Sequence, residues 1–173
     1  STVLLDKFGF LKLNINQTRS WIDRTKIRRG LTYSVLYPLM RLLPLKKDTV
    51  LFESLWGQSY NDSPRAMYKY LSKQRPNMKF VWILKNEQTP VEGPAIRVRQ
   101  MSFKYWYYMA RAKYLVQNTN FPNQYSKRAG QIEVETLHGT FMKVMGFDEP
   151  HFKNASNRVQ KNFAKRIGRW DLM

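Results

Sequence analysis

Short apolar runs alternate with amphipathic stretches over the last three-quarters of the chain. Each run is compact, ends in polar residues and is followed by a loop, which is typical of buried strands. The predicted strands are residues 49–54, 79–85, 95–99, 113–118 and 131–140. Between them, apolar spacing predicts helices over residues 65–74 and 102–112. Strands that alternate with helices favour an α/β fold with a mainly parallel sheet covered on both faces.

The first 47 residues have a different pattern of apolar and polar positions. Apolar and polar residues alternate over residues 10–16, so residues 1–17 are interpreted as the end of a preceding β domain. Residues 18–47 are interpreted as a basic amphipathic helical segment in which Gly30 stops a first helix and Pro38 bends or breaks a second, leucine-rich one. Residues 48–173 then form the α/β domain.

Two interpretations of the leucine-rich helix stay open from its own pattern. Its apolar stretch contains Arg41 and is shorter than the roughly 20 residues that span a bilayer. At a membrane interface, the leucines would face acyl chains, and Tyr33 and Tyr37 would lie at headgroup depth. Alternatively, the helix packs on the domain that follows. The dense basic charge around it favours the membrane surface.

The net charge of the chain limits the kinds of molecule that it is expected to bind. The 173 residues contain 30 Lys and Arg against 12 Asp and Glu, a formal net charge of +18, and no cysteine. The first 47 positions hold ten of the basic residues and two of the acidic ones. An anionic partner is therefore expected: nucleic acid, a phospholipid surface or a phosphate-rich substrate. The missing cysteines exclude disulfides and thiolate metal sites.

Polar groups follow three of the predicted strands. Right-handed crossovers bring the carboxyl ends of parallel strands to one edge of a sheet, where ligands bind. The candidates for this edge are Glu53, Ser54, Asn118, His138, Gly139 and Thr140. A neutral imidazole at His138 can accept a proton from an attacking hydroxyl. Gly139 permits close approach of the backbone to a ligand, and Thr140 can cap a helix whose N-terminus attracts phosphate.

Other kinds of site find no support in the pattern. No serine stands in a nucleophile-elbow motif, and no partner for a catalytic triad can be assigned. Metal ligands do not cluster, and no cofactor is expected. His151 lies in a loop-like stretch and is interpreted as a surface residue.

Three stretches in register carry a resemblance. They are "VLFESLWGQSYNDSPRAMYKYL", "YMARAKYLVQNTNFP" and "QIEVETLHGTFMKVMGFD", within residues 49–148. They resemble the CDP-glycerol and CDP-ribitol polyolphosphotransferases that build teichoic acid, and related bacterial capsule polymerases. That family carries Trp-His-Gly-Thr-Pro after a strand, where this chain has Leu137 to Phe141, with Phe141 in place of the proline.

The resemblance implies the Rossmann-like, acceptor-side domain of a GT-B-type enzyme, peripheral at the cytoplasmic face of the bacterial membrane. Such an enzyme transfers glycerol phosphate or ribitol phosphate from a CDP-activated donor to the hydroxyl end of a lipid-linked polyol-phosphate or glycan acceptor, releasing CMP. His138 aligns with the family's histidine base. The donor is held mainly by a C-terminal domain, so this chain is expected to be the front of a longer enzyme and inactive alone.

Two rival functions remain. A basic nucleic-acid-binding module would explain the charge and the interleaved aromatic residues. Against it, much of the charge flanks a leucine-rich helix, and no RNP, KH or zinc pattern is present, so nucleic acid is not the expected partner. A GT-B enzyme that transfers a sugar is the second rival, since the donor site lies elsewhere.

Overall fold

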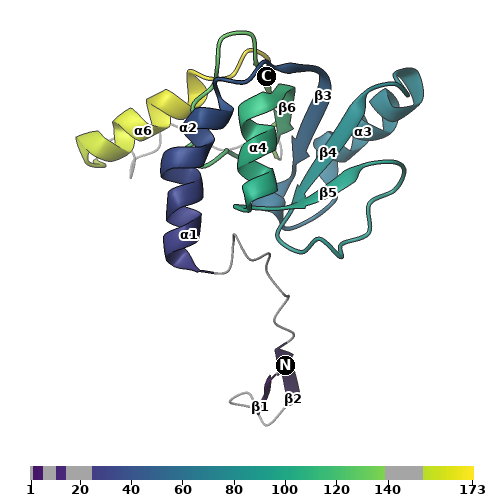
Figure 1. Ribbon diagram of the computed structural model, residues 1–173, viewed down its shortest axis with the longest axis vertical. Helices are drawn as coiled ribbons and strands as arrows, with labels where there is room; N and C mark the ends of the chain where they lie inside the picture. The colour runs from purple at the N-terminus through teal and green to yellow at the C-terminus, as the bar shows by residue number, and fades with distance from the viewer. Residues whose placement is uncertain (1, 6–10, 15–24, 139–153) are drawn as a thin grey trace.

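The predicted apolar runs form one parallel sheet. The computed structural model describes residues 2–5, 11–14, 25–138 and 154–173. Its central sheet has the strand order β5-β4-β3-β6-β7, and all four pairings are parallel (Figure 1). The strands are β3 (Lys46–Glu53), β4 (Lys79–Leu84), β5 (Ile96–Arg99), β6 (Ala112–Gln117) and β7 (Ile132–Glu135). The predicted mainly parallel α/β sheet is confirmed.

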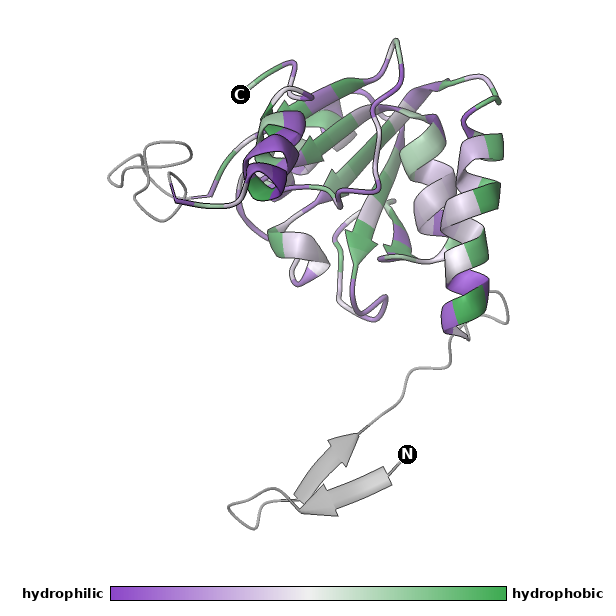
Figure 2. Cartoon of the chain, turned by 90° about the vertical axis from the view of Figure 1, so that its left-hand side faces the viewer, coloured by the Kyte–Doolittle hydropathy of each residue, from purple (hydrophilic) through white to green (hydrophobic). Residues whose placement is uncertain are grey.

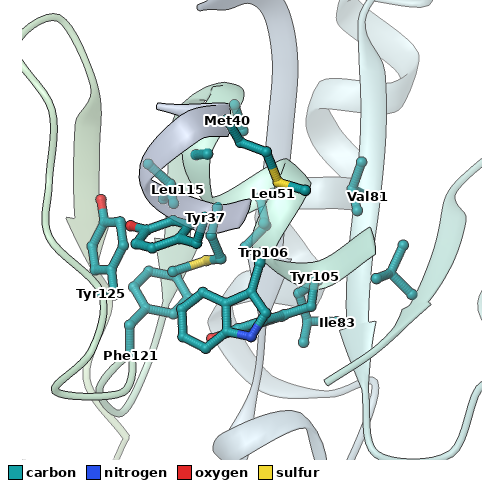
Figure 3. Packing of buried hydrophobic residues seen from close by; sticks show 14 residues of the cluster. Tyr37, Met40, Leu51, Val81, Ile83, Tyr105, Trp106, Leu115, Phe121 and Tyr125 are labelled. Carbon is teal, nitrogen blue, oxygen red and sulfur yellow. The ribbon is translucent and has the colours of Figure 1, made fainter. Parts of the chain in front are cut away.

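Helices cover the two faces of this sheet. On one side, α3 (Asp62–Gln74) packs on an aromatic cluster that includes Phe52 and Trp82, whose stacked rings lie 5.5 Å apart. On the other side, α4 (Phe103–Arg111) packs Tyr105 and Trp106 against the strands (Figure 3), and Met109 is buried in the same cluster. Figure 2 shows the strands as the most hydrophobic layer between these helices. Burial on both faces explains why the strands read as continuous apolar runs.

The leucine-rich segment is helical from Lys26 to Met40, as α1 (Lys26–Leu31), η2 (Thr32–Leu36) and α2 (Tyr37–Met40). The prediction that Gly30 stops the helix is wrong, because the helix runs through it. Pro38 does not break the helix either. The π-helical turn η2 precedes it, and a wider turn relieves the clash between a proline ring and the preceding carbonyls.

One face of this helix belongs to the core. Tyr37 is 3% exposed, and its ring lies 4.9 Å from that of Trp106 on α4. Met40 is buried in the same cluster, and Leu36 packs against it. The expectation that Tyr37 lies at headgroup depth is therefore wrong. The core-helix interpretation is correct for this face.

The two ends of the chain add smaller elements. β1 (Thr2–Leu5) and β2 (Leu11–Asn14) pair antiparallel, as the alternating pattern predicted for β2. Near the other end, α6 (Asn157–Ile167) is a helix that was not among the predicted elements. After α6, Leu172 forms a parallel bridge with Val134 of β7. This bridge ties the end of the chain to the sheet.

Candidate functional site

The carboxyl ends of all five strands meet at one edge of the sheet, and the backbone there is strained. Positive φ angles in residues other than glycine are uncommon and cluster at functional sites. Within the described residues they occur at Leu55, Trp56, Asp62, Met101 and Leu137. These residues all follow the carboxyl ends of β3, β5 or β7. The strain is therefore confined to the edge where the sequence predicted a site.

Asn118, directly after β6, organises the loop that follows β3. Its Oδ1 accepts a hydrogen bond from the Leu55 backbone N–H at 2.9 Å. Its Nδ2 donates to Asp62 Oδ2 at 2.7 Å and lies 3.4 Å from Ser54 Oγ. Asn118 is 1% exposed and Ser54 is fully buried. The structure thus brings these two predicted residues together, as supports of the loop beneath the edge.

Gly57 closes that loop tightly. Its φ is +71°, a left-handed conformation that favours glycine, and a Cβ on it would lie 3.3 Å from the Lys85 backbone nitrogen. The Lys85 N–H in turn donates to the Gly57 carbonyl at 2.7 Å. The tight turn leaves the neighbouring Trp56 side chain 47% exposed, with a backbone φ of 52°. The fold therefore holds a large aromatic ring out over the edge.

Glu53, the last residue of β3, lies below the surface. It is 1% exposed, and its Oε1 accepts a hydrogen bond from Gln100 Nε2 at 2.7 Å. Its Oε2 has no hydrogen-bond partner among the described atoms. Burial raises the pKa of Glu53 to about 8, against the lowering effects of Gln100 and Lys85. The carboxyl is therefore mainly protonated at neutral pH, and it fixes Gln100.

His138 lies three residues beyond β7 and is exposed. Its ring centroid lies 6.2 Å from that of Trp56, with 59° between the ring planes. Its approach to the edge is fixed by two hydrogen bonds: the Leu137 N–H donates to Glu135 Oε1 at 2.8 Å, and the Thr136 N–H donates to the Gln117 carbonyl at 2.8 Å. The imidazole is thus accessible on a held backbone, as a proton acceptor requires. Gly139 and Thr140 lie outside the described residues.

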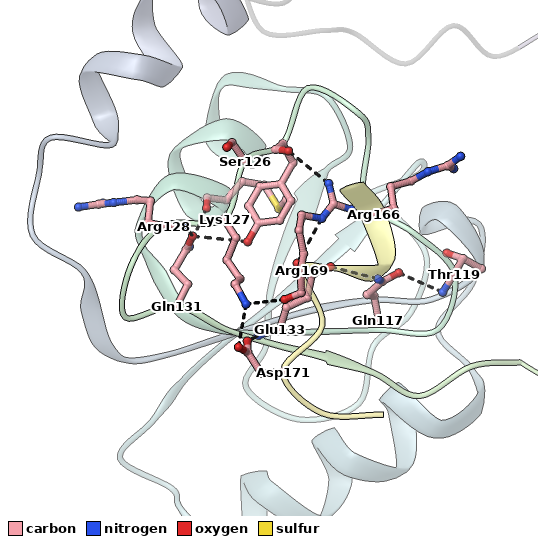
Figure 4. Close-up of polar contacts among 12 residues, drawn as sticks. Gln117, Thr119, Ser126, Lys127, Arg128, Gln131, Glu133, Arg166, Arg169 and Asp171 are labelled. Atoms are coloured by element: carbon pink, nitrogen blue, oxygen red, sulfur yellow. Dashed lines mark hydrogen bonds and ion pairs between the residues drawn. The ribbon is translucent and has the colours of Figure 1, made fainter. Parts of the chain in front are cut away.

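A polar network holds the last residues of the chain along the outer side of β7 (Figure 4). Arg169 is 6% exposed and donates from Nη1 to the Tyr125 carbonyl at 3.2 Å. Its Nε lies 3.5 Å from Glu133 Oε2, and Glu133 is fully buried on β7. Burial raises the pKa of Glu133 to about 7, although Arg169 and Lys127 lower it. Asp171 adds a carboxylate that accepts from the Glu133 N–H at 2.7 Å.

A pocket of about 320 Å³ opens next to Trp56. It is lined by Trp56, Lys85, Gln100, Asn120, Phe121, Pro122, Asn123 and Arg166. We call it the edge pocket. None of these residues was predicted, although Lys85 and Gln100 directly follow β4 and β5. The strand-end argument would have found these two if applied to all five strands. Within the described ranges, no three His, Cys, Asp or Glu side chains gather as metal ligands.

Comparison with known proteins identifies the family to which the chain is similar. Residues 35–173 match the family of CDP-glycerol:poly(glycerophosphate) glycerophosphotransferases. A teichoic acid poly(glycerol phosphate) polymerase of Bacillus subtilis (strain 168) is 33% identical over 157 residues, which cover 86% of this chain and 21% of that protein.

Solved structures of the wall teichoic acid polymerase TagF are similar as well. A variant with one histidine replaced by asparagine superposes with a TM-score of 0.75 at 28% identity, covering 86% of this chain and 37% of the polymerase. The same variant soaked with CDPG gives a TM-score of 0.71 at 30% identity. The chain thus spans well under half the length of these relatives.

The matched region contains the whole parallel sheet, the strained edge and His138. The chain belongs to the CDP-glycerol:poly(glycerophosphate) glycerophosphotransferase family.

Proposed function

We propose that this chain is the acceptor-side part of a CDP-polyol phosphotransferase that extends a bacterial cell-wall polymer. The observation that carries the proposal is the accessible imidazole of His138 on a held backbone at the carboxyl edge of the sheet, within the family match. Glycerol is the favoured polyol, because the family and the B. subtilis relative are named for glycerol phosphate. A relative soaked with CDPG supports a CDP-activated donor.

In the proposed reaction, His138 acts as the general base. Its neutral imidazole takes the proton of the acceptor hydroxyl as the oxygen attacks the phosphorus that carries glycerol. The bond from that phosphorus to the bridging oxygen breaks, and CMP leaves. Phosphoryl transfer depends mainly on positioning and charge neutralisation. The exposed His138 and the fixed loop beside it are suited to positioning the acceptor hydroxyl, so a mechanism without a covalent nucleophile fits this site better.

The donor is proposed to bind outside these 173 residues, in a second domain of a GT-B-type enzyme. In support, the chain covers 37% of the polymerase whose fold it shares. At the carboxyl edge of the sheet, the predicted residues Glu53, Ser54 and Asn118 are buried. We therefore propose that they shape the acceptor side indirectly, while a lipid-linked polyol-phosphate chain approaches His138.

Product analysis tests this function. The complete enzyme, incubated with an oligo(glycerol phosphate) acceptor, is expected to release CMP from CDP-glycerol and to lengthen the acceptor by whole glycerol-phosphate units. The same assay with CDP-ribitol and with nucleotide sugars serves as the comparison. Transfer from a nucleotide sugar without transfer from either CDP-polyol would contradict the proposal and favour a sugar transferase.

We also propose that the helix from Lys26 to Met40 lies on the anionic membrane surface at the cytoplasmic face. Its outward face carries an apolar stripe of Ile27, Leu31, Val35 and Leu39, which are 84%, 56%, 45% and 54% exposed, and Leu42 in the turn after the helix is 81% exposed. Basic residues lie within or directly after the helix at Lys26, Arg29 and Arg41. Among the described helices, none is long and apolar enough to cross a membrane. An exposed apolar stripe beside basic residues is typical of interfacial binding.

Serine substitutions test this surface. Leu31, Leu39 and Leu42 are suitable because they are exposed, whereas Leu36 supports the core. Losing half of the ~1.5–3 kcal/mol that each buried leucine contributes should weaken binding to anionic vesicles by more than about tenfold. Co-sedimentation at low and high salt measures it.

Tyr70→Ser, at an exposed aromatic on α3, is the matched control and should bind like the unchanged chain. Equal binding of the triple variant and this control would refute membrane binding through the stripe. Binding to DNA but not to vesicles would instead favour a nucleic-acid partner.

A further inference from the structure

The edge pocket lies beside the proposed base and is built from segments far apart in the sequence. Trp56 connects the two, since it lines the pocket and its ring lies 6.2 Å from that of His138. The other lining residues come from the ends of β4 and β5, from the loop after β6 and from α6. A ligand that reaches His138 with one end can therefore place its next few atoms in this pocket.

The lining of the pocket is positively charged. It contains Lys85 and Arg166 and no Asp or Glu. The Glu53 carboxyl, which accepts a hydrogen bond from Gln100 of the lining, is kept mainly neutral by burial, which raises its pKa to about 8. Burial and the neighbouring Arg169 both lower the pKa of Arg166. The two cations thus lack a compensating anion in the lining, and a bound anion would supply one.

The neutral groups of the pocket suit a hydroxylated carbon chain. Asn120 Oδ1 is buried and has no hydrogen-bond partner among the described atoms, so it can accept from a hydroxyl. Gln100 is held in place by its 2.7 Å bond to Glu53. The half-exposed indole of Trp56 offers a flat apolar face to carbon atoms.

The size of the pocket limits the ligand. Its volume of about 320 Å³ lies at the lower end of the ~300–1,000 Å³ that ligand pockets span. A single phosphorylated polyol unit matches this size better than a nucleotide does. The pocket therefore favours the polymer over the CDP part of the donor.

We propose that the edge pocket is a subsite for the polyol-phosphate unit adjoining the reacting hydroxyl of the acceptor. In this subsite, Lys85 and Arg166 pair with the phosphodiester, Asn120 accepts a polyol hydroxyl and Trp56 packs on the carbon backbone. The subsite rests on the proposed function, because it assigns a place to that reaction's acceptor. It also explains how one unit is aligned with His138 before transfer.

Steady-state kinetics of the complete enzyme test the subsite. Lys85→Met and Arg166→Met each remove a charge-assisted hydrogen bond, which is worth ~1.5–3 kcal/mol, so the KM for oligo(glycerol phosphate) should rise roughly 10- to 100-fold. The KM for CDP-glycerol should stay unchanged. Lys73→Met, an exposed lysine near the far end of α3, is the matched control. An acceptor KM equal to the control's, or a rise confined to the donor KM, would overturn the assignment.

A binding measurement separates this proposal from the function it rests on. The Trp56 indole N–H signal, assigned by Trp56→Phe, is followed by NMR as sn-glycerol 3-phosphate, glycerol or inorganic phosphate is added. We expect a saturable shift with sn-glycerol 3-phosphate in the unchanged chain and in Lys73→Met, and none in Lys85→Met. If the Trp56 signal shifts in this way but product analysis finds transfer from nucleotide sugars only, the phosphate subsite stands and the proposed function is refuted. No shift, or equal shifts with inorganic phosphate alone, would overturn the subsite.

Discussion

Replacing His138 with alanine in the complete enzyme is expected to lower kcat by about 100- to 10,000-fold, the usual contribution of general-base catalysis. The side chain is exposed, and its described ring contact is with Trp56, so little packing is lost. The melting temperature should therefore stay within about 1–2 °C, as for surface substitutions away from special features. Initial rates and a thermal melt of the same preparation measure both quantities.

His138→Gln separates proton transfer from positioning. Glutamine keeps hydrogen-bonding capacity but cannot take the proton, so its rate should stay close to that of the alanine variant. Near-full activity of His138→Gln would make the residue a phosphate-contacting or positioning group. A large fall in stability of His138→Ala, with the remaining soluble protein active, would make it structural.

Arg169→Met is expected to lower the free energy of unfolding by about 2–4 kcal/mol at pH 8, from ~1–3 kcal/mol for a buried carbonyl left without its donor and up to ~1.4 kcal/mol for Glu133, which takes up a proton when its cation is removed. The substitution leaves Glu133 fully buried without its nearest cation and leaves the Tyr125 carbonyl without its donor. Urea unfolding followed by circular dichroism measures the change. Arg158→Met, at an exposed arginine on α6, should have little effect.

The pH dependence of the free energy of unfolding shows whether the charge on Glu133 causes the loss of stability. The pKa of folded Glu133, about 7, lies above the ordinary value of 4.5, so its contribution to stability is fully present below pH 4.5 and is lost as pH rises towards 7. Without Arg169 the folded pKa rises further, which extends this loss to higher pH at about 1.4 kcal/mol per pH unit. The variant should therefore differ from the unchanged chain less at pH 6 than at pH 8. Glu133→Gln in the Arg169→Met background should recover stability at pH 8, and a deficit independent of pH would contradict this account.

The parallel sheet was predictable because its strands are buried on both faces. Val81 and Ile83 face one helix layer and Phe80 and Trp82 the other, so the run needs no polar positions. The helix stop at Gly30 failed because a glycine costs a helix only ~1 kcal/mol, which the burial of Tyr37 and Met40 offsets. Helix α6 was predictable but missed: Val159, Phe163 and Ile167 recur at helical spacing, although none of its residues is fully buried.

The site was predictable in outline and not in detail. His138, Asn118 and Glu53 were predicted from their positions at the ends of strands, because the topology of a parallel sheet brings all carboxyl ends to the same edge. The burial of Glu53 was not predictable, since carboxylates are seldom fully buried and nothing in the local sequence indicates its bond to Gln100. The exposure of Trp56 depends on a left-handed backbone set by the contact of Gly57 with Lys85.

The bridge between Leu172 and β7 has a consequence for synthesis. The Glu133 and Glu135 N–H groups on the outer edge of β7 donate to Asp171 Oδ2 and to the Leu172 carbonyl, residues translated more than thirty positions later. While the nascent chain grows, the sheet can assemble, but this edge stays open until those residues leave the ribosome. Open strand edges template pairing with other chains. A ribosome that stalls shortly before Asp171 is therefore expected to hold an aggregation-prone chain that chaperones must shield.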